Sequence, residues 1–392
     1  MQSLHSESSS LVLSATFWWL MFIPAALAGS DAEYYPLNAW QAFNGGEMNA
    51  SAFVFRDLNT NGIYDVGDRP MANAAVVMSS SSHPSITQRT NISGFANFTT
   101  SGSQRDANIV EPGRYDFRAV PPPGWDITTG NATQSATFEI LRGAPGDMIA
   151  TSTLEPVGLS PKLYIQGTTD ASAERVKLLA TAPDGKQVPV AVDEGGGFRI
   201  PASRGLWSIE LVQGPMQTKV ERLVEVGSSP VVLSRVASGD RRAMELHAEP
   251  VSFDDLLLVE SVGKIPSGYE QVSWRNWVVA HNRVYSGEGY INGTMSGEYV
   301  AYNGSGHPAV IESAASFDFA GGYFSVAWSD AEGETLRLLA WRGEELVHQD
   351  ELALSAMGPV YFAADYRDIT RLELSTEHFW QFVGDDLGLT AR

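Results

Sequence analysis

The sequence predicts an all-β protein built as a string of β-sandwiches. Short runs of alternating apolar and polar residues, rich in β-branched and aromatic side chains, follow one another along the chain. Gly, Asn, Asp or Pro interrupts these runs about every 8 to 12 residues, the usual spacing of strands and turns in sandwiches. After residue 30 no stretch keeps a helical period, apart from an ambiguous DDLLLVESV. These observations favour tandem sandwiches over a helical architecture.

The chain begins with a predicted secretory signal peptide, residues 1–28. The run from residue 11 to 27 is apolar apart from two hydroxyl side chains, and Ala26-Leu27-Ala28 supplies a small-x-small cleavage site. The positive charges that usually precede such a run are missing. A membrane anchor is the alternative, because the run is almost as long as the roughly 20 residues that span a bilayer. We expect cleavage before Gly29 and a secreted, extracellular chain with no later membrane span.

The net charge and the cysteine count limit the kinds of binding partner and the means of stabilisation that this chain can use. The net charge is −20, and it becomes −19 without residues 1–28, because that segment carries Glu7 and no Lys or Arg. A chain this acidic is not attracted to nucleic acid or to anionic membranes, and cations are its natural partners. The cysteine count of 0 excludes a disulfide framework. The remaining length, about 360 residues, suits two or three domains.

Segments rich in Pro, Gly and Ser divide the mature chain into three predicted domains: residues 38–154, 160–249 and 251–392. The middle domain reads as a small prealbumin-like sandwich with a tight hairpin turn at Asp184-Gly185. It contains no constellation of residues that suggests chemistry, so we favour a spacer or presentation role over a binding role. The third domain is the most aromatic of the three.

The first domain contains an oxygen-rich loop, FRDLNTNGIYDVGDRP, directly after the alternating run SAFVF. Counted from its first aspartate, side-chain oxygens fall at positions 1, 3, 5, 9 and 12, with glycine at position 6 and a carbonyl donor at position 7. This is the spacing of a twelve-residue EF-hand calcium loop, although position 12 is Asp instead of Glu and no helix flanks the loop. The predicted Ca²⁺ ligands are Asp57, Asn59, Asn61, the Ile63 carbonyl, Asp65 and Asp68.

A hydrated hairpin turn at Asn61-Gly62 is the alternative interpretation of this loop. It leaves three carboxylates in one turn that repel one another unless a cation compensates them. We therefore favour calcium as a structural cofactor.

Several motifs of the first domain occur in a recognisable order: VFRDLNTNGIYDVGDRPMANAAVVM, TNISGFANFTT, PGRYDFRAVPPPGW and TTGNATQSATFEI. They resemble the B domain of serine-aspartate-repeat surface proteins, within the wider group of collagen-adhesin B-type sandwiches. The resemblance covers residues 49–154 and implies an immunoglobulin-like or prealbumin-like sandwich whose loop binds calcium structurally. Some relatives carry an internal Lys to Asn isopeptide bond. The first domain cannot, because the earliest lysine is Lys162.

The third domain contains VSFDDLLLVESVGKIPSGYEQVSWRNWVV and FDFAGGYFSVAWSD. It resembles, over nearly its whole length, the jelly-roll domain of secreted proteins with PEP-CTERM sorting tails, and in outline carbohydrate-binding modules. The Pro-Glu-Pro motif and basic tail of that sorting signal are missing from this sequence. The resemblance implies a jelly-roll-like fold and no single activity.

Two candidate sites lie in the third domain. A stacking surface for sugar rings is predicted at aromatic residues that lie among Gly, Asn and Ser: Trp274, Trp277, Tyr285 and Tyr290. The alternative is that these side chains form core. A second metal site is predicted where the terminal strands of a jelly roll meet, with Asp254, Asp255, Asp385 and Asp386 as donors. A solvated acidic edge is the alternative.

The sequence favours a protein without catalytic activity. It contains no H-E-x-x-H zinc motif, no G-x-S-x-G elbow and no cysteine nucleophile. Two acids far apart in sequence can meet in a fold, as in glycosidases, so that alternative stays open. We expect a secreted, calcium-stabilised extracellular protein for adhesion or for matrix or surface assembly, whose ligand is extracellular matrix, a cell surface or a polysaccharide. The alternative is a carbohydrate-binding accessory protein that acts through its C-terminal domain.

Overall fold

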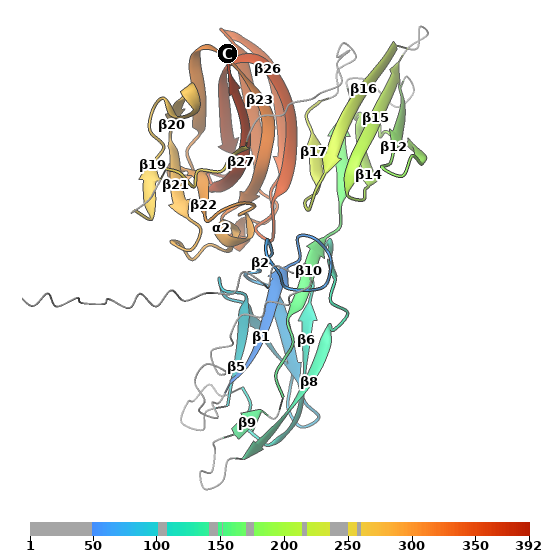
Figure 1. Ribbon diagram of the computed structural model, residues 1–392, viewed down its shortest axis with the longest axis vertical. Helices are drawn as coiled ribbons and strands as arrows, with labels where there is room; N and C mark the ends of the chain where they lie inside the picture. Colours follow the sequence, from blue (N-terminus) through green and yellow to red (C-terminus); the bar gives the residue numbers. More distant parts are fainter. Residues whose placement is uncertain are drawn as a thin grey trace, which may run out of the picture.

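A computed structural model describes residues 49–100, 108–140, 148–150, 152–169, 176–213, 218–235, 250–256 and 260–392. The predicted signal peptide and the first residues of the first domain lie outside these ranges. The described part is nearly all β, as predicted, with one short helix, α2 (Glu288–Asn292), and three 3₁₀ turns, η1 (Tyr269–Gln271), η2 (Gly304–Gly306) and η3 (Ser329–Ala331). Figure 1 shows the first domain below and the other two side by side above it. No helix among these residues is both long and apolar enough to cross a membrane.

The first domain is a sandwich of two sheets. One consists of β1 (Asn49–Arg56), β2 (Arg69–Pro70), β5 (Phe95–Thr99), β7 (Trp125–Ile127) and β10 (Val157–Pro161). The other consists of β3 (Ala75–Ser79), β4 (Ile86–Arg89), β6 (Gly113–Val120), β8 (Thr133–Ile140) and β9 (Met148–Ala150). Strand β10 pairs in parallel with β1 and antiparallel with β7, so the sandwich extends to Pro161, past the expected end at Leu154. The reason is that Val157 and Leu159 are buried in the sheet.

Strand β1 is buried on both faces. Ala52 and Val54 point into the core between the sheets, where Phe98 is among their buried neighbours. Phe53 and Phe55 point to the opposite face and are equally buried.

The middle domain combines two layers. One is the sheet of β12 (Val176–Thr181), β13 (Gln187–Val190), β15 (Gly205–Gln213) and β16 (Thr218–Val226). The other contains β11 (Tyr164–Thr168), β14 (Gly197–Pro201) and β17 (Val231–Leu233). The predicted turn between β12 and β13 is confirmed, because the Gly185 N–H donates to the Ala182 carbonyl (2.8 Å) and Gly185 has φ 84°.

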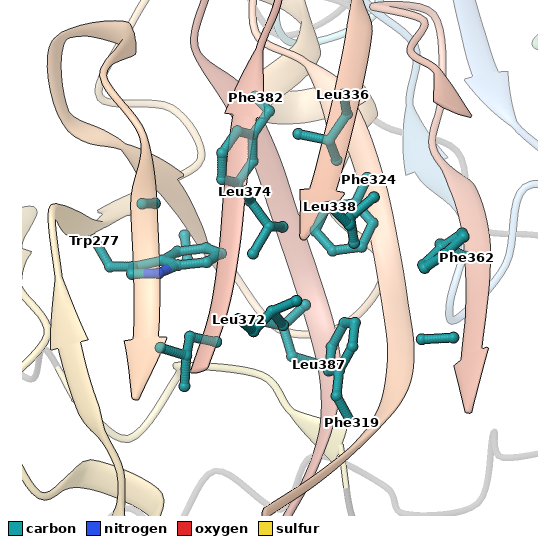
Figure 2. Close-up of a cluster of buried hydrophobic side chains, with 14 of the residues drawn as sticks. Trp277, Phe319, Phe324, Leu336, Leu338, Phe362, Leu372, Leu374, Phe382 and Leu387 are labelled. Atoms are coloured by element: carbon teal, nitrogen blue, oxygen red, sulfur yellow. The ribbon is translucent and has the colours of Figure 1, made fainter. Parts of the chain in front are cut away.

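The C-terminal domain is built on three strands that cross most of it: β23 (Ala309–Val326), β26 (Val360–Thr376) and β27 (Phe382–Ala391). The shorter strands are β18 (Pro250–Val251), β19 (Val262–Lys264), β20 (Ser273–Arg275), β21 (Trp277–His281), β22 (Tyr299–Asn303), β24 (Thr335–Arg342) and β25 (Glu345–Ala353). The pairing of β23 with β26 shifts register between Glu312 and Gly321, and such bulges let one sheet bend around a core. Figure 2 shows that core.

The second and third domains share one sheet. Strand β17 pairs in parallel with β11 on one side and with β26 on the other, with Val231 opposite Tyr361. The buried Arg222 reinforces this join, because its Nη2 donates to the Ala363 carbonyl (2.6 Å). Strand β17 thus connects the sheets of the second and third domains into one.

Candidate functional site

The predicted calcium loop connects β1 to β2, and its first aspartate is almost completely buried. Asp57 is 1% exposed, and its carboxylate accepts hydrogen bonds from the backbone N–H groups of Asn61 (3.2 Å) and Gly62 (2.8 Å). Gly62 has φ 77°, a left-handed conformation that glycine adopts without strain. The sharp turn expected at position 6 of the loop is therefore present.

The amide side chains of the loop surround Asp65. Asn59 Nδ2 donates to both carboxylate oxygens of Asp65 (3.0 and 3.2 Å), and Asn61 Nδ2 donates to Oδ2 (2.7 Å). The amide oxygen of Asn61 accepts from the N–H of Ile63 (2.8 Å). These contacts join the side chains of Asn59, Asn61 and Asp65 into one connected group.

Asp68 closes the loop at its other end. Its carboxylate accepts from the N–H groups of Leu58 (2.8 Å) and Asp65 (3.2 Å). Burial first, and the charges of Asp57 and Asp65 to a smaller extent, raise the pKa of Asp68 to about 6 against the opposing effect of the two N–H donors. Negative charge is therefore concentrated at this end of the loop.

Tyr64, in the middle of the loop, anchors it to the sandwich. The Tyr64 ring lies 5.0 Å from the ring centroid of Phe53 and 5.1 Å from that of Phe55, edge to face in both cases. The loop thus folds back over the outer face of β1, which explains why both faces of that strand are buried. Packing of this kind holds the donor atoms in place without a helix on either side.

The donor set of this loop fits a hard cation. Among the described residues no three His, Asp or Glu side chains converge tightly enough to hold a metal ion by themselves. A cation in the loop would therefore use the amide oxygens of Asn59 and Asn61 and the Ile63 carbonyl as well as carboxylates. An all-oxygen set that mixes carboxylates, amides and a carbonyl is typical of Ca²⁺ sites.

Arg56, the residue before this loop, reaches into the C-terminal domain. It is 2% exposed, and its Nη1 donates to the carbonyls of Asn292 and Thr294, the latter at 3.1 Å. Burial, and then the charge of Arg69, lower the pKa of Arg56 to about 10, while Asp385 and Asp68 oppose that shift. This buried cation was not among the candidates from sequence, although a charged residue that ends the apolar run SAFVF was a visible signal.

Asn292, the last residue of α2, completes the junction between the first and third domains. It is fully buried, and its amide pairs with the backbone of Ala72: the Ala72 N–H donates to Oδ1 (2.9 Å) and Nδ2 donates to the Ala72 carbonyl (3.1 Å). Nδ2 also donates to the Ala356 carbonyl (2.9 Å). One amide therefore joins the segment after β2 to two segments of the C-terminal domain. Nothing in the local sequence around Asn292 pointed to this role.

The predicted second metal site takes a different form. The terminal strands do lie together, since Val251 of β18 pairs with Leu387 of β27. Asp385 is fully buried and accepts from the N–H groups of Met295 (2.7 Å) and Ser296 (3.2 Å). Burial, followed by the charge of Asp386, holds the pKa of Asp385 well above its ordinary value.

The other three acids of that group are also engaged by the protein. Asp386 accepts from the Ser296 hydroxyl (2.6 Å), and Asp254 accepts from the N–H of Glu298 (2.7 Å). Asp255 accepts from the Tyr269 hydroxyl (2.8 Å), away from this loop. The four carboxylates do not form one site, and the interpretation as a second metal centre is corrected: three of them anchor the loop from residue 295 to 299.

The predicted sugar-stacking surface is wrong because its aromatic side chains are core. Trp274 is 8% exposed and Trp277 is 2% exposed, and their rings pack edge to face with centroids 5.5 Å apart. Figure 2 shows Trp277 pointing into the hydrophobic cluster beside Phe382. Tyr290 is fully buried, and Tyr285 is half-buried with its hydroxyl 3.0 Å from that of Tyr302. A buried ring cannot stack on a ligand.

A cleft of about 760 Å³ lies between the first and third domains. Arg89 and Trp125 line it from the first domain, and Asp330 and Met357 from the C-terminal domain. This cleft lies beside the junction, and none of the sites predicted from the sequence includes its lining residues.

No protein-family model matches the chain, and no curated protein matches it. Solved structures similar to it include the Bacillus anthracis TIE protein, at 8% identity and a TM-score of 0.23 over 82% of this chain and 51% of that one. The CBM51-2 and INT domains from Clostridium perfringens ZmpB match at 10% identity and a TM-score of 0.24 over 52% and 43% of the two chains. A streptococcal ancillary pilin matches at 13% identity and a TM-score of 0.20 over 47% and 61%. The chain thus spans about half the length of the Bacillus anthracis structure, and TM-scores this low carry no argument about function.

Proposed function

We propose that the protein is an extracellular, calcium-stabilised scaffold for adhesion or for matrix or surface assembly. The observation that carries the proposal is the position of the oxygen-rich loop. Its first predicted ligand, Asp57, directly follows Arg56, whose buried guanidinium holds the C-terminal domain. The predicted calcium ligand and the residue that contacts the C-terminal domain are consecutive in the chain. Calcium bound by the loop would therefore also stabilise the contact between the two domains.

The proposed role of calcium follows from the charges. Asp57 and Asp68 stand at the two ends of the loop, next to the ends of β1 and β2. A bound Ca²⁺ would neutralise their repulsion and hold these two strand ends together. Arg56 and Ala72 lie just outside the loop, and both bind backbone or amide groups of the C-terminal domain. Calcium would thereby keep the first domain fixed against the third.

A rigid arrangement suits a protein that must present surfaces at fixed positions outside the cell. Sharing of a sheet between the second and third domains adds to that rigidity. The proposal assigns the chain a binding role instead of a catalytic one, with extracellular matrix, a cell surface or a polysaccharide as partner.

Calcium removal tests this proposal. We expect Kd on the order of 10⁻⁴ to 10⁻³ M, because two side-chain ligands are neutral amides and Asp68 is shorter than the usual Glu. At about 5 mM Ca²⁺ this corresponds to about 1 to 2.5 kcal/mol of added stability. The melting temperature of the full chain should therefore be higher in calcium than in EDTA, and the loop should resist proteolysis.

The matched variants are Asp57→Asn and Asp126→Asn. The first removes a predicted ligand charge and should abolish the calcium dependence. The second removes an exposed carboxylate from β7 of the same sandwich and should leave the dependence intact. Equal melting temperatures of the parent chain in calcium and EDTA would contradict calcium binding and restore the hydrated hairpin.

Carbohydrate binding through the C-terminal domain is the second candidate function. It is favoured by one observation, a pair of exposed aromatic side chains, Phe379 and Trp380, at the turn after β26. A glycan array with the full chain tests it, because a reproducible signal from one class of glycan is expected. An array without any signal would leave only the scaffold role.

A further inference from the structure

The turn between β26 and β27 exposes two consecutive aromatic side chains. Phe379 is 65% exposed and Trp380 is 37% exposed. The other large apolar side chains that stand out from the described surface are all aliphatic and come from separate places: Val66, Val110, Leu206, Val284 and Leu346. An adjacent aromatic pair is therefore unusual on this molecule.

The backbone holds Phe379 in a costly conformation. Its φ of 61° lies in the left-handed region, where a bulky residue is rarely found. The neighbouring loop contacts the turn closely, since a Cβ on Gly306 would lie 1.6 Å from the Phe379 carbonyl oxygen. Strain of this kind persists only where surrounding contacts enforce it, and it points to a function for the residue so held.

Two asparagine side chains bond to the backbone next to this turn. Asn303 is fully buried; its Nδ2 donates to the His307 carbonyl (3.1 Å) and to the Trp380 carbonyl (3.4 Å), and its Oδ1 accepts from the Phe382 N–H (2.8 Å). Asn276 Nδ2 also donates to the His307 carbonyl (2.9 Å). The buried amide of Asn303 thus ties the loop at His307 to the turn at Trp380, while the aromatic rings stay outside.

Polar groups stand beside the rings. The His307 ring lies 6.2 Å from the Phe379 ring at an angle of 72°. The exposed His378 is held by Glu334, itself 6% exposed, which accepts from the His378 N–H (3.1 Å) and lies 3.0 Å from its Nδ1. The surface therefore combines two aromatic side chains with two imidazoles, of which that of His378 is held by Glu334.

We propose that Phe379, Trp380 and His307 form a binding site for neutral carbohydrate. The C–H face of a sugar ring would stack on the aromatic rings, and its hydroxyls would bond to the imidazoles of His307 and His378. A neutral ligand is favoured because the net charge of −20 repels acidic glycans. This inference rests on the second proposed function and gives it a location.

The size of the patch favours a sugar over a protein. An aromatic side chain offers roughly 150 to 250 Å², so the two exposed fractions together present on the order of 200 Å². A standard protein interface buries about 800 Å² on each partner. The patch matches one or two sugar rings and covers only about a quarter of the area that a protein partner would bury.

The test uses the full chain with three neutral polysaccharides, cellulose, chitin and mannan, and with alginate as an anionic control. We expect binding to at least one neutral polymer and none to alginate. Phe379→Ala and Trp380→Ala should each weaken binding about tenfold or more, as for aromatic hot spots. Trp380→Phe should retain most of the affinity but lose the change in tryptophan fluorescence on ligand addition, a signal that a merely structural role would not produce.

Two control variants locate the effect. Leu346→Ala removes an exposed aliphatic side chain of the same domain, and Arg89→Ala changes the interdomain cleft. Both should bind like the parent. Melting temperatures of all variants should match that of the parent, which excludes unfolding as the cause of lost binding.

Three results would overturn the inference. If a neutral polymer binds but Phe379→Ala and Trp380→Ala leave its affinity unchanged, the site lies elsewhere and carbohydrate binding itself stands. If the parent binds none of the polymers, both the site and the second function fail. If the parent instead self-associates and the two variants do not, the patch is a contact between copies of this chain.

Discussion

Two groups of carboxylates flank Arg56, and they are used in different ways. In the loop after β1, Asp57, Asp65 and Asp68 face amide side chains and the backbone of their own loop. On the other side, Asp385 accepts hydrogen bonds from a different segment, at Met295. Both groups favour the charged form of Arg56. The comparison shows that the two groups differ in what they hold: Asp57 and Asp68 accept from N–H groups of their own loop, whereas Asp385 fixes a segment 90 positions away.

The largest effect is expected from Asp385→Ala. It leaves the buried N–H groups of Met295, Ser296 and Asp386 without an acceptor. We expect a loss of about 2 to 5 kcal/mol of unfolding free energy, measured by urea denaturation of the full chain. The loss should be the same with and without calcium, because this group is an anchor and not a metal site.

Asp385→Asn is the matched control. It keeps one acceptor oxygen and the shape of the side chain, and a raised pKa means that the site already disfavours the negative charge. It should cost much less than Asp385→Ala. Stability that depends on calcium in the parent and loses that dependence in either variant would reverse the assignment of the two acidic groups.

A smaller effect is expected from Asn292→Ala, at about 1 to 3 kcal/mol. The change removes the pairing of the Asn292 amide with Ala72 and Ala356 and should loosen the first domain from the third. Small-angle scattering should then show a larger radius of gyration.

Asn282→Ala is the control for this change. Asn282 is also buried, but its Nδ2 donates to Thr294 Oγ1 (3.2 Å) within the C-terminal domain. It should lower stability without changing the scattering. Identical scattering of the parent and of Asn292→Ala would argue against a rigid junction.

The smallest effect concerns Asp68 and pH. Its folded pKa of about 6 exceeds the ordinary value of 3.8, so the folded chain holds this proton more tightly than the unfolded chain does. In EDTA the stability that the proton supplies is complete below about pH 4 and is lost as pH rises through 6. Calcium needs the ionised form, so the difference in melting temperature between calcium and EDTA should grow from pH 5 to pH 7.

The variant Asp68→Asn tests whether the pH dependence of stability comes from Asp68 or from another titrating residue. The variant should lose both the fall in EDTA and the growing calcium effect that the parent shows. A calcium effect in the parent of equal size at pH 5 and pH 7 would count against Asp68 as a ligand.

Local sequence patterns were sufficient to predict the strands and the sharp turn of the oxygen-rich loop. Alternation and turn residues are properties of a few neighbouring positions, and the conformation of Gly62 and the turn at Gly185 follow from them. The five side chains of the loop lie within twelve residues, so their spacing alone brings them together. Calcium binding and the role of these side chains as ligands stay predictions.

Burial of aromatic side chains required the tertiary structure. Trp277 and Trp380 both stand beside polar residues in the sequence, yet the first is core and the second is exposed. Which face of a strand meets the opposite layer depends on register and on bulges such as those in β23. A reading of neighbours in sequence therefore placed the buried Trp277 on the surface.

The junction between the domains also depends on tertiary contacts that the sequence did not predict. The sequence alone specified alternating strands, an oxygen-rich loop, an acidic surface and three segments of domain size. That Arg56 meets Thr294, 238 positions away, and that β17 pairs with β26 were decided by contacts between distant segments. Such contacts depend on surfaces built from segments far apart in the chain, because a buried guanidinium is stable only where carbonyls and carboxylates surround it.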